Sequence, residues 1–221
     1  MVRPLPPVAP VPRLWPGSTV VCLGTGPSLT QADVDACRGR ARVIAVNDAY
    51  RLAPWADVLY AADYKWWRIH QGVPTFAGRK FSIMADGIQI AQQEYRDVHI
   101  LRNTGRDGLE LEPNALRTGL NSGYQAINLA VHLGASTIVL LGYDMAPAAD
   151  GRRHFFGDHP APLQRYSKFA DFLRHFDTIA EPLAAAGVRV VNASRQSALT
   201  VFPFKALSQA LALESREAVA R

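Results

Sequence analysis

The chain has only two cysteines among its 221 residues, Cys22 and Cys37. They do not form a C-x-x-C pair, and the sequence contains no H-E-x-x-H pattern. Neither a standard zinc site nor a redox dithiol is therefore predicted. We expect both cysteines to be small residues of the core.

Long apolar runs are also missing, since no stretch approaches the ~20 residues that a membrane span needs. The first residues are rich in proline and do not form a charged segment followed by an apolar one, so no signal peptide is predicted. We expect a cytoplasmic protein. The formal net charge of +5 favours anionic ligands but is too small to indicate nucleic-acid binding by itself.

The length and the 48% hydrophobic content are typical of one α/β domain. We divide the chain into a proline-rich arm (1–16), a nucleotide-binding domain (17–204) and a C-terminal helix or tail (205–221). Apolar runs alternate with helical segments, which predicts a doubly wound, mostly parallel sheet. The expected strands are 19–23, 42–47, 56–63, 80–84, 97–101, 137–142 and 188–192.

Four further segments complete this prediction. Residues 102–119 have little periodicity and are expected to form a long loop near the site. Residues 124–134 show a helical apolar face that ends at Gly134. A long helix is expected over 162–186, with Pro182 ending or kinking it. A last amphipathic helix is expected over 204–220.

The first strand runs directly into the turn Gly24-Thr25-Gly26-Pro27-Ser28. Ser28 and Thr30 are suitable caps for the next helix, whose N-terminus would offer N–H groups to a phosphate. A nucleotide site and an ordinary tight turn are both consistent with this pattern. The turn departs from G-x-G-x-x-G, which argues against a standard NAD site, and no Gly-Lys-Ser/Thr follows, which excludes a Walker loop.

Polar residues end several other predicted strands. In open α/β sheets, ligands bind outside the carboxyl ends of the strands, so these residues are expected near one another. Any single one is explained equally well as a turn or cap residue. The candidates are Asn47, Asp63, Tyr143 and Asp144, together with Asn121, Ser122 and Gly123 at a helix start.

The segment from His154 to His159 is the best source of proton-transfer chemistry. Histidine titrates near neutral pH, and Asp158 is close enough in sequence to orient a ring. A polar surface loop and a metal site of His154, Asp158 and His159 are the alternatives, although the spacing matches no standard zinc pattern. The histidines at 70, 99, 132 and 175 are interpreted as structural.

Four motifs together resemble a known group of enzymes: Gly24 to Leu29, Asn47, Leu120 to Gly123, and Leu140 to Asp144. They resemble the bacterial sialyltransferases that use CMP-sialic acid, and also the group of the archaeal hydroxymethylpterin diphosphokinase. Uncharacterised phage and prophage proteins carry similar Gly-Tyr-Asp-Met and Gly-Asp-His-Pro patterns. The resemblance covers about Val20 to Pro203 and implies a Rossmann-like, GT-A-variant-like single domain.

The sialyltransferase resemblance implies nucleotide contacts from Gly24, Thr25, Gly26, Asn47, Ser122 and Gly123. Thr25 stands where that family has asparagine. The resemblance also implies a general base at His154 or His159 and a phosphate contact from Tyr166, to which we add Arg165. The diphosphokinase resemblance implies magnesium and ATP held by Asp63 and Asp144.

Three hypotheses follow from the sequence. The first is a glycosyltransferase that moves a sugar from a nucleotide donor to a hydroxyl acceptor, which could be a glycan or DNA, with a histidine base. The second is a magnesium-dependent pyrophosphokinase, and the third is a non-catalytic phage or prophage accessory protein. No cofactor is assigned beyond a nucleotide or nucleotide sugar and optional magnesium, and a homo-oligomer is left open.

Overall fold

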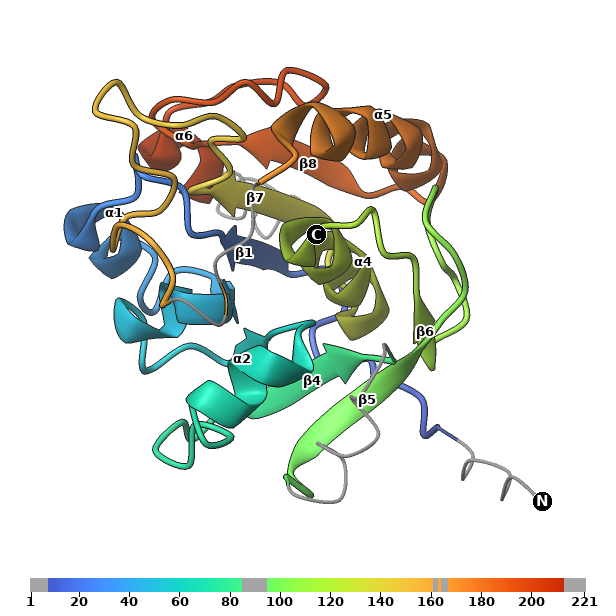
Figure 1. The fold of residues 1–221 in the computed structure, drawn as a ribbon. Helices are drawn as coiled ribbons and strands as arrows, with labels where there is room; N and C mark the ends of the chain where they lie inside the picture. The colour runs from blue at the N-terminus through green and yellow to red at the C-terminus, as the bar shows by residue number, and fades with distance from the viewer. Residues whose placement is uncertain (1–7, 85–94, 161–162, 164–166, 213–221) are drawn as a thin grey trace.

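The computed structural model describes residues 8–84, 95–160, 163 and 167–212. Within these ranges an eight-stranded sheet, parallel throughout, forms the centre of a single α/β domain (Figure 1). The predicted fold class is confirmed. The strands are β1 (Thr19–Leu23), β2 (Arg42–Val46), β3 (Val58–Tyr60), β4 (Arg79–Ile83), β5 (Val98–Asn103), β6 (Ala115–Leu116), β7 (Thr137–Leu141) and β8 (Arg189–Asn192).

The strand order is β6-β5-β4-β3-β2-β1-β7-β8. The chain thus builds outward from β1 to β6, returns, and adds β7 on the other side of β1. Leu23, the last residue of β1, is in register with Ala45 of β2 and with Leu141 of β7. The order of strands therefore reverses between β1 and β7, which is where an open α/β sheet usually forms its ligand crevice.

Helices cover both faces of the sheet. One face packs against α4 (Ser122–Leu133) and α5 (Phe169–Ala185). The other packs against α1 (Gln31–Asp35), the 3-10 helix η1 (Asn47–Arg51), α2 (Tyr64–Ile69) and α6 (Leu207–Leu211). Because both faces are covered, β1 and β7 are buried along their whole length.

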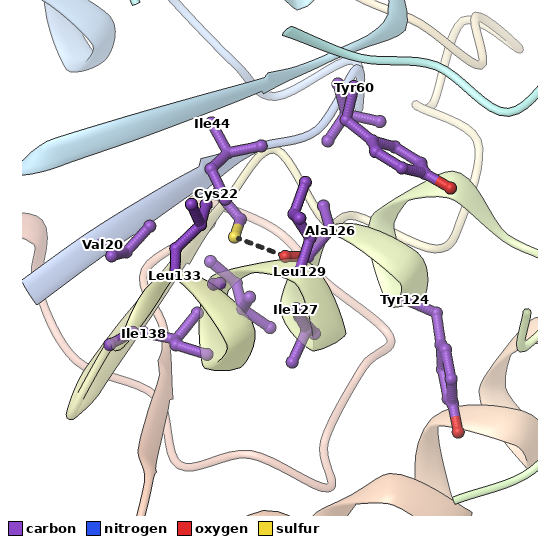
Figure 2. Close-up of a cluster of buried hydrophobic side chains, with 14 of the residues drawn as sticks. Val20, Cys22, Ile44, Tyr60, Tyr124, Ala126, Ile127, Leu129, Leu133 and Ile138 are labelled. Atoms are coloured by element: carbon purple, nitrogen blue, oxygen red, sulfur yellow. Dashed lines mark hydrogen bonds between the residues drawn. The ribbon is translucent and has the colours of Figure 1, made fainter. Parts of the chain in front are cut away.

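Figure 2 shows the core between α4 and the sheet. Val20 and Cys22 of β1 and Ile44 of β2 lie against Leu129 and Leu133 of α4, and all five are fully buried. The Cys22 thiol lies 3.8 Å from the Ala126 carbonyl, and burial raises the pKa of this thiol to about 12. Both cysteines are free and buried, as predicted from the sequence.

The arm that precedes β1 packs on the domain from residue 8 onward. Its N–H groups reach the rest of the chain at Val11, which donates to Pro113, and at Trp15, which donates to the Leu133 carbonyl. Trp15 is buried, whereas Leu14 beside it is 39% exposed.

Three elements differ from the sequence prediction. The expected loop 102–119 contains β6, and β5 continues to Asn103. Helix α5 begins at Phe169, and Pro182 lies inside it one turn from its end. Proline lacks an N–H, but its carbonyl still accepts from the Ala186 N–H at 3.0 Å, so the last turn is retained.

Buried Asn128 of α4 explains the short strand β6. Its Oδ1 accepts from the N–H groups of Glu110 and Arg117, and its Nδ2 donates to the Glu110 carbonyl. A single amide side chain therefore satisfies three backbone groups of the 104–117 segment. Contacts with α4 therefore hold this segment in place, although its sequence has no periodic apolar pattern.

Candidate functional site

A pocket of about 220 Å³ opens at the carboxyl edge of the sheet, where the paired strands β1 and β7 end. It is bounded by the turns that follow these two strands, the end of β2, the start of α4, the loop after β7 and the start of α5. Its lining includes eleven residues predicted or implied by the sequence as binding or catalytic: Gly24, Thr25, Gly26, Asn47, Asn121, Ser122, Gly123, Tyr143, Asp144 and His154, with Leu120 from the resembling motif.

The turns after β1 and β7 are bound directly to each other. The Gly24 N–H donates to the Leu141 carbonyl, and the Gly26 N–H donates to the Gly142 carbonyl, both at 2.8 Å. A Cβ on Gly24 would lie 2.4 Å from the Gly142 oxygen, and one on Gly26 would lie 2.1 Å from Asp144 Oδ1. Glycine is therefore required here by the approach of two segments of the chain.

Asp144 already occupies the anion position of the first turn. Its carboxylate accepts from the Ser28 N–H at 2.8 Å and from the Ser28 hydroxyl at 2.9 Å. Burial raises the pKa of Asp144, and the two Ser28 contacts oppose this effect. Ser28 thus binds a carboxylate of the chain and does not cap α1, whose N-cap is Thr30. The N–H groups of Gly26 and Ser28, in the turn that the sequence predicted as part of a nucleotide site, are therefore both engaged within the protein.

The start of α4 retains donors that point to the pocket. Asn121 is the N-cap, and its Oδ1 accepts from the N–H groups of Gly123 and Tyr124. Among the described residues, neither the N–H nor the hydroxyl of Ser122 is engaged, and Ser122 lines the pocket. Tyr143 fixes this helix start against β7, because its buried hydroxyl donates to the Gly123 carbonyl at 3.1 Å.

Three non-glycine residues of the pocket have left-handed backbone angles. They are Asn47 (φ 49°), Leu120 (φ 52°) and Met145 (φ 50°). Such a conformation costs of order 1–2 kcal/mol per residue, and asparagine tolerates it better than leucine or methionine. Strained backbone of this kind gathers at ligand sites. Leu120 is in addition 45% exposed, which leaves an apolar side chain at the pocket.

His154 lies over the first turn and is held there by two contacts. Its Nδ1 is 2.9 Å from Thr25 Oγ1, and the next N–H, that of Phe155, donates to the Thr25 carbonyl. The ring stacks on Phe156 at a centroid distance of 5.0 Å. Burial lowers the pKa of His154 to about 4, and the neighbouring His159 contributes to the decrease. The ring is therefore neutral at pH 7.

The remaining predicted site residues lie elsewhere. His159 packs edge-on against His154, at 4.5 Å between ring centroids, and is outside the pocket lining. Asp63 is the N-cap of α2, where its carboxylate accepts from the Lys65 N–H. Asp158 and Pro27 are likewise not among the lining residues. Arg165 and Tyr166 lie outside the described residues.

The candidate metal ligands are not gathered. Asp144 uses both carboxylate oxygens on Ser28, and Asp63 caps a helix away from the pocket lining. In the described part of the chain, no three His, Cys, Asp or Glu side chains are placed to hold a metal ion.

Several lining residues were not identified from the sequence. Phe169 and Phe172 come from the first turn of α5, and Met145 and Ala146 from the loop after β7. The sequence signal for the two phenylalanines is their i, i+3 spacing, which also fits an ordinary buried helix face. Only the position of α5 beside the pocket separates these interpretations.

Comparison with known proteins gives a likeness in structure but none in sequence. No protein family model matches the chain, and no curated protein is similar to it in sequence. The MAf glycosyltransferase of Magnetospirillum magneticum AMB-1 superimposes with a TM-score of 0.62 and 13% identity over 96% of this chain. The fold is glycosyltransferase-like. The chain spans 38% of the length of that protein.

A second solved structure is the sialyltransferase CstII of Campylobacter jejuni, in complex with the substrate analogue CMP-3FNeuAc. It has a TM-score of 0.49 and 14% identity, with 85% of each chain covered.

Within the described residues, no helix is long and apolar enough to cross a membrane.

Proposed function

We propose that this protein is a glycosyltransferase that moves a sugar from a nucleotide donor to a hydroxyl acceptor, with His154 as the general base. One observation carries the proposal. The open N-terminus of α4, at Ser122, and the His154 ring line the same pocket at the β1/β7 crevice. An anion site and a proton acceptor at one crevice are what transfer from a nucleotide sugar requires.

The phosphate of the donor is assigned to Ser122. A helix N-terminus carries a partial positive charge and unpaired N–H groups, which favour phosphate. In the turn after β1, the Asp144 carboxylate occupies the corresponding donors, so a phosphate there would meet a carboxylate and no free Ser28 N–H. Asn47, at the end of β2, is assigned to the base or ribose of the nucleotide.

His154 is suited to accept the acceptor proton. When Nδ1 carries the ring proton and donates it to Thr25 Oγ1, Nε2 presents a lone pair. The bond from the acceptor oxygen to the sugar carbon forms as the bond from that carbon to the phosphate oxygen breaks. The hydroxyl proton passes to Nε2, and the phosphate charge is stabilised by the Ser122 donors.

The first test is a thermal-shift panel with CMP, CDP, UDP, GDP, ADP, ATP and CMP-sialic acid, each with magnesium and with a chelator. A ligand at about 100 times its Kd stabilises the protein by about 2.7 kcal/mol, which the panel detects. We expect a shift with a nucleotide or nucleotide sugar that persists in chelator. A shift only with ATP and magnesium would favour a pyrophosphokinase instead.

No shift with any nucleotide would contradict the proposal and favour a non-catalytic accessory protein. Where a nucleotide sugar binds, its hydrolysis and its transfer to glycan or DNA acceptors are measured next. His154→Gln is expected to retain nucleotide binding and to lose at least about 100-fold in transfer rate, the usual contribution of a positioned base. Asp150→Asn, an exposed residue outside the pocket lining, is the matched control and is expected to stay within a few-fold of wild type.

A further inference from the structure

A buried carboxylate lies behind the histidines of the pocket. Asp48 follows Asn47 at the end of β2, and only 5% of its side chain is exposed. Oδ2 accepts from the Trp66 indole N–H at 2.9 Å, which fixes the carboxylate from α2. The proposed reaction does not use Asp48.

Two histidines lie near this carboxylate, and Arg51 lies 3.8 Å from its Oδ1. His159 Nδ1 lies 3.8 Å from Oδ2, and His70 Nε2 lies 3.6 Å from Oδ1. His70 is fixed by stacking on Trp66 at 4.2 Å between centroids and by the Tyr50 hydroxyl at 3.2 Å. His70 therefore helps to hold the Asp48 carboxylate in place, whereas the sequence suggested only a separate structural role for it.

His159 has an unusual buried atom. Its Nδ1 is buried and makes no hydrogen bond with any described residue, although the Asp48 carboxylate is close by. A buried ring N–H without an acceptor costs about 1–3 kcal/mol. An approach of about 1 Å would give an ordinary hydrogen bond, and such contacts often tighten only when substrate binds.

His159 in turn contacts His154, the ring that lines the pocket. The two rings meet edge to face at 4.5 Å, and Phe156 packs on both, at 5.0 Å from each. Asp48, His159 and His154 thus form a continuous path from α2 and η1 to the pocket. By orienting the His159 ring, the Asp48 carboxylate can in this way also affect the position of the His154 ring.

We propose that Asp48 is a positioning residue: it holds His159 as the Nδ1–H tautomer, and His159 holds the His154 ring in place for proton transfer. When His154 accepts a proton at Nε2, it becomes a cation, and the negative charge of Asp48 stabilises that cation. The proton stays on His154 until it leaves to solvent, so neither Asp48 nor His159 changes protonation. The catalytic role of His154 rests on the proposed function.

Other charges face the two rings. Asp48 and Asp158 favour the protonated form of both His154 and His159, Asp63 favours that of His159, and Arg153 opposes that of His154. His70 is additionally faced by Arg51 and by His159. Asp158 is therefore the natural control, because it acts on the same rings without the Asp48 contact.

The test is NMR of the histidine rings in the free protein, with wild type, Asp48→Asn and Asp158→Asn. Long-range ¹H–¹⁵N spectra report the tautomer of each ring, and pH titration reports its pKa. In wild type we expect His159 as the Nδ1–H tautomer. In Asp48→Asn the amide oxygen is expected to keep the place of Oδ2, because the Trp66 N–H needs an acceptor there. We therefore expect the Nδ1–H tautomer of His159 to be retained and the pKa of His154 to fall with the lost negative charge.

Asp158→Asn is expected to leave the His159 tautomer unchanged. The proposal is wrong if His159 is the Nε2–H tautomer in wild type, if Asp48→Asn leaves the titration of His154 as in wild type, or if Asp158→Asn lowers the pKa of His154 as much as Asp48→Asn does. Where Asp48→Asn does not fold, His159→Gln takes its place. Loss of the neighbouring ring should raise the pKa of His154, and no change would show that the two rings are not coupled.

This experiment uses no ligand, so its outcome is independent of the nucleotide panel. Nucleotide binding with unchanged histidine spectra would refute the role of Asp48 alone. The expected spectra without any nucleotide binding would refute the proposed function alone.

Discussion

Ser122→Pro tests the assignment of the phosphate without breaking the helix. Ser122 is the first residue of α4, and Asn121 before it is extended, with φ −143° and ψ 128°. Proline is favoured at the first helical position, and an extended residue is what it requires before it. The change removes the Ser122 N–H and hydroxyl, and leaves the Asn121 cap on Gly123 and Tyr124 in place.

The expected magnitude follows from the donors that are lost. A hydrogen bond to a charged group contributes about 1.5–3 kcal/mol. At 1.4 kcal/mol per tenfold, nucleotide affinity should fall about 10- to 100-fold. The free protein should change by no more than about 0.5 kcal/mol, or about 2 °C in Tm, because neither donor is engaged among the described residues.

The assay is calorimetric titration of the nucleotide found in the panel, combined with thermal unfolding of the free variant. Ser122→Ala, which keeps the N–H, is the matched control and should lose only about 2- to 10-fold, the value of one ordinary hydrogen bond. Unchanged affinity in Ser122→Pro, with an unchanged Tm, would refute the phosphate assignment. A large loss of Tm would instead refute the view that Ser122 makes no contribution to folding.

Three further predictions concern stability. Asn128→Leu should lower the free energy of unfolding by about 1.5–4.5 kcal/mol, because three hydrogen bonds to partly buried backbone groups are lost at about 0.5–1.5 kcal/mol each; a loss below about 1 kcal/mol in urea unfolding would contradict this role. Since the pKa of His154 falls from 6.5 to about 4 on folding, the unfolded chain binds the proton more tightly, so stability should decrease from about pH 6.5 down to about pH 4. The same series with His154→Gln should show a smaller decrease, and an equal one would exclude the histidine as a cause. Gly26→Ala should lower the free energy of unfolding by at least about 1–3 kcal/mol, because the new methyl group clashes with Asp144 Oδ1. If the variant unfolds at the same denaturant concentration as wild type, the turns after β1 and β7 can move apart without cost.

Much of the fold follows from local pattern. The runs at 20–23, 43–46 and 138–141 are apolar without alternation, which is expected where both faces of a sheet are covered, and all three are buried parts of strands. Gly134 ends α4 in the left-handed conformation expected for a C-terminal glycine. Asn47 and Ser122 were candidates because they follow a strand or begin a helix, and His154 because histidine titrates near neutral pH; the topology brings all three to one pocket.

The sequence by itself therefore determined the alternation of strands and helices and the edge of the sheet at which polar residues gather, because these depend on periodicity and on strand ends. Only the tertiary structure decided which donors remain open there. Ser28 is bound by Asp144, 116 residues away, and β6 is held by the side chain of Asn128. The proposed anion site thus moves from α1 to α4, and Asp48 comes to face His159 from 111 positions away in the chain. Contacts between residues so distant in sequence leave no local pattern, so the fold had to place them.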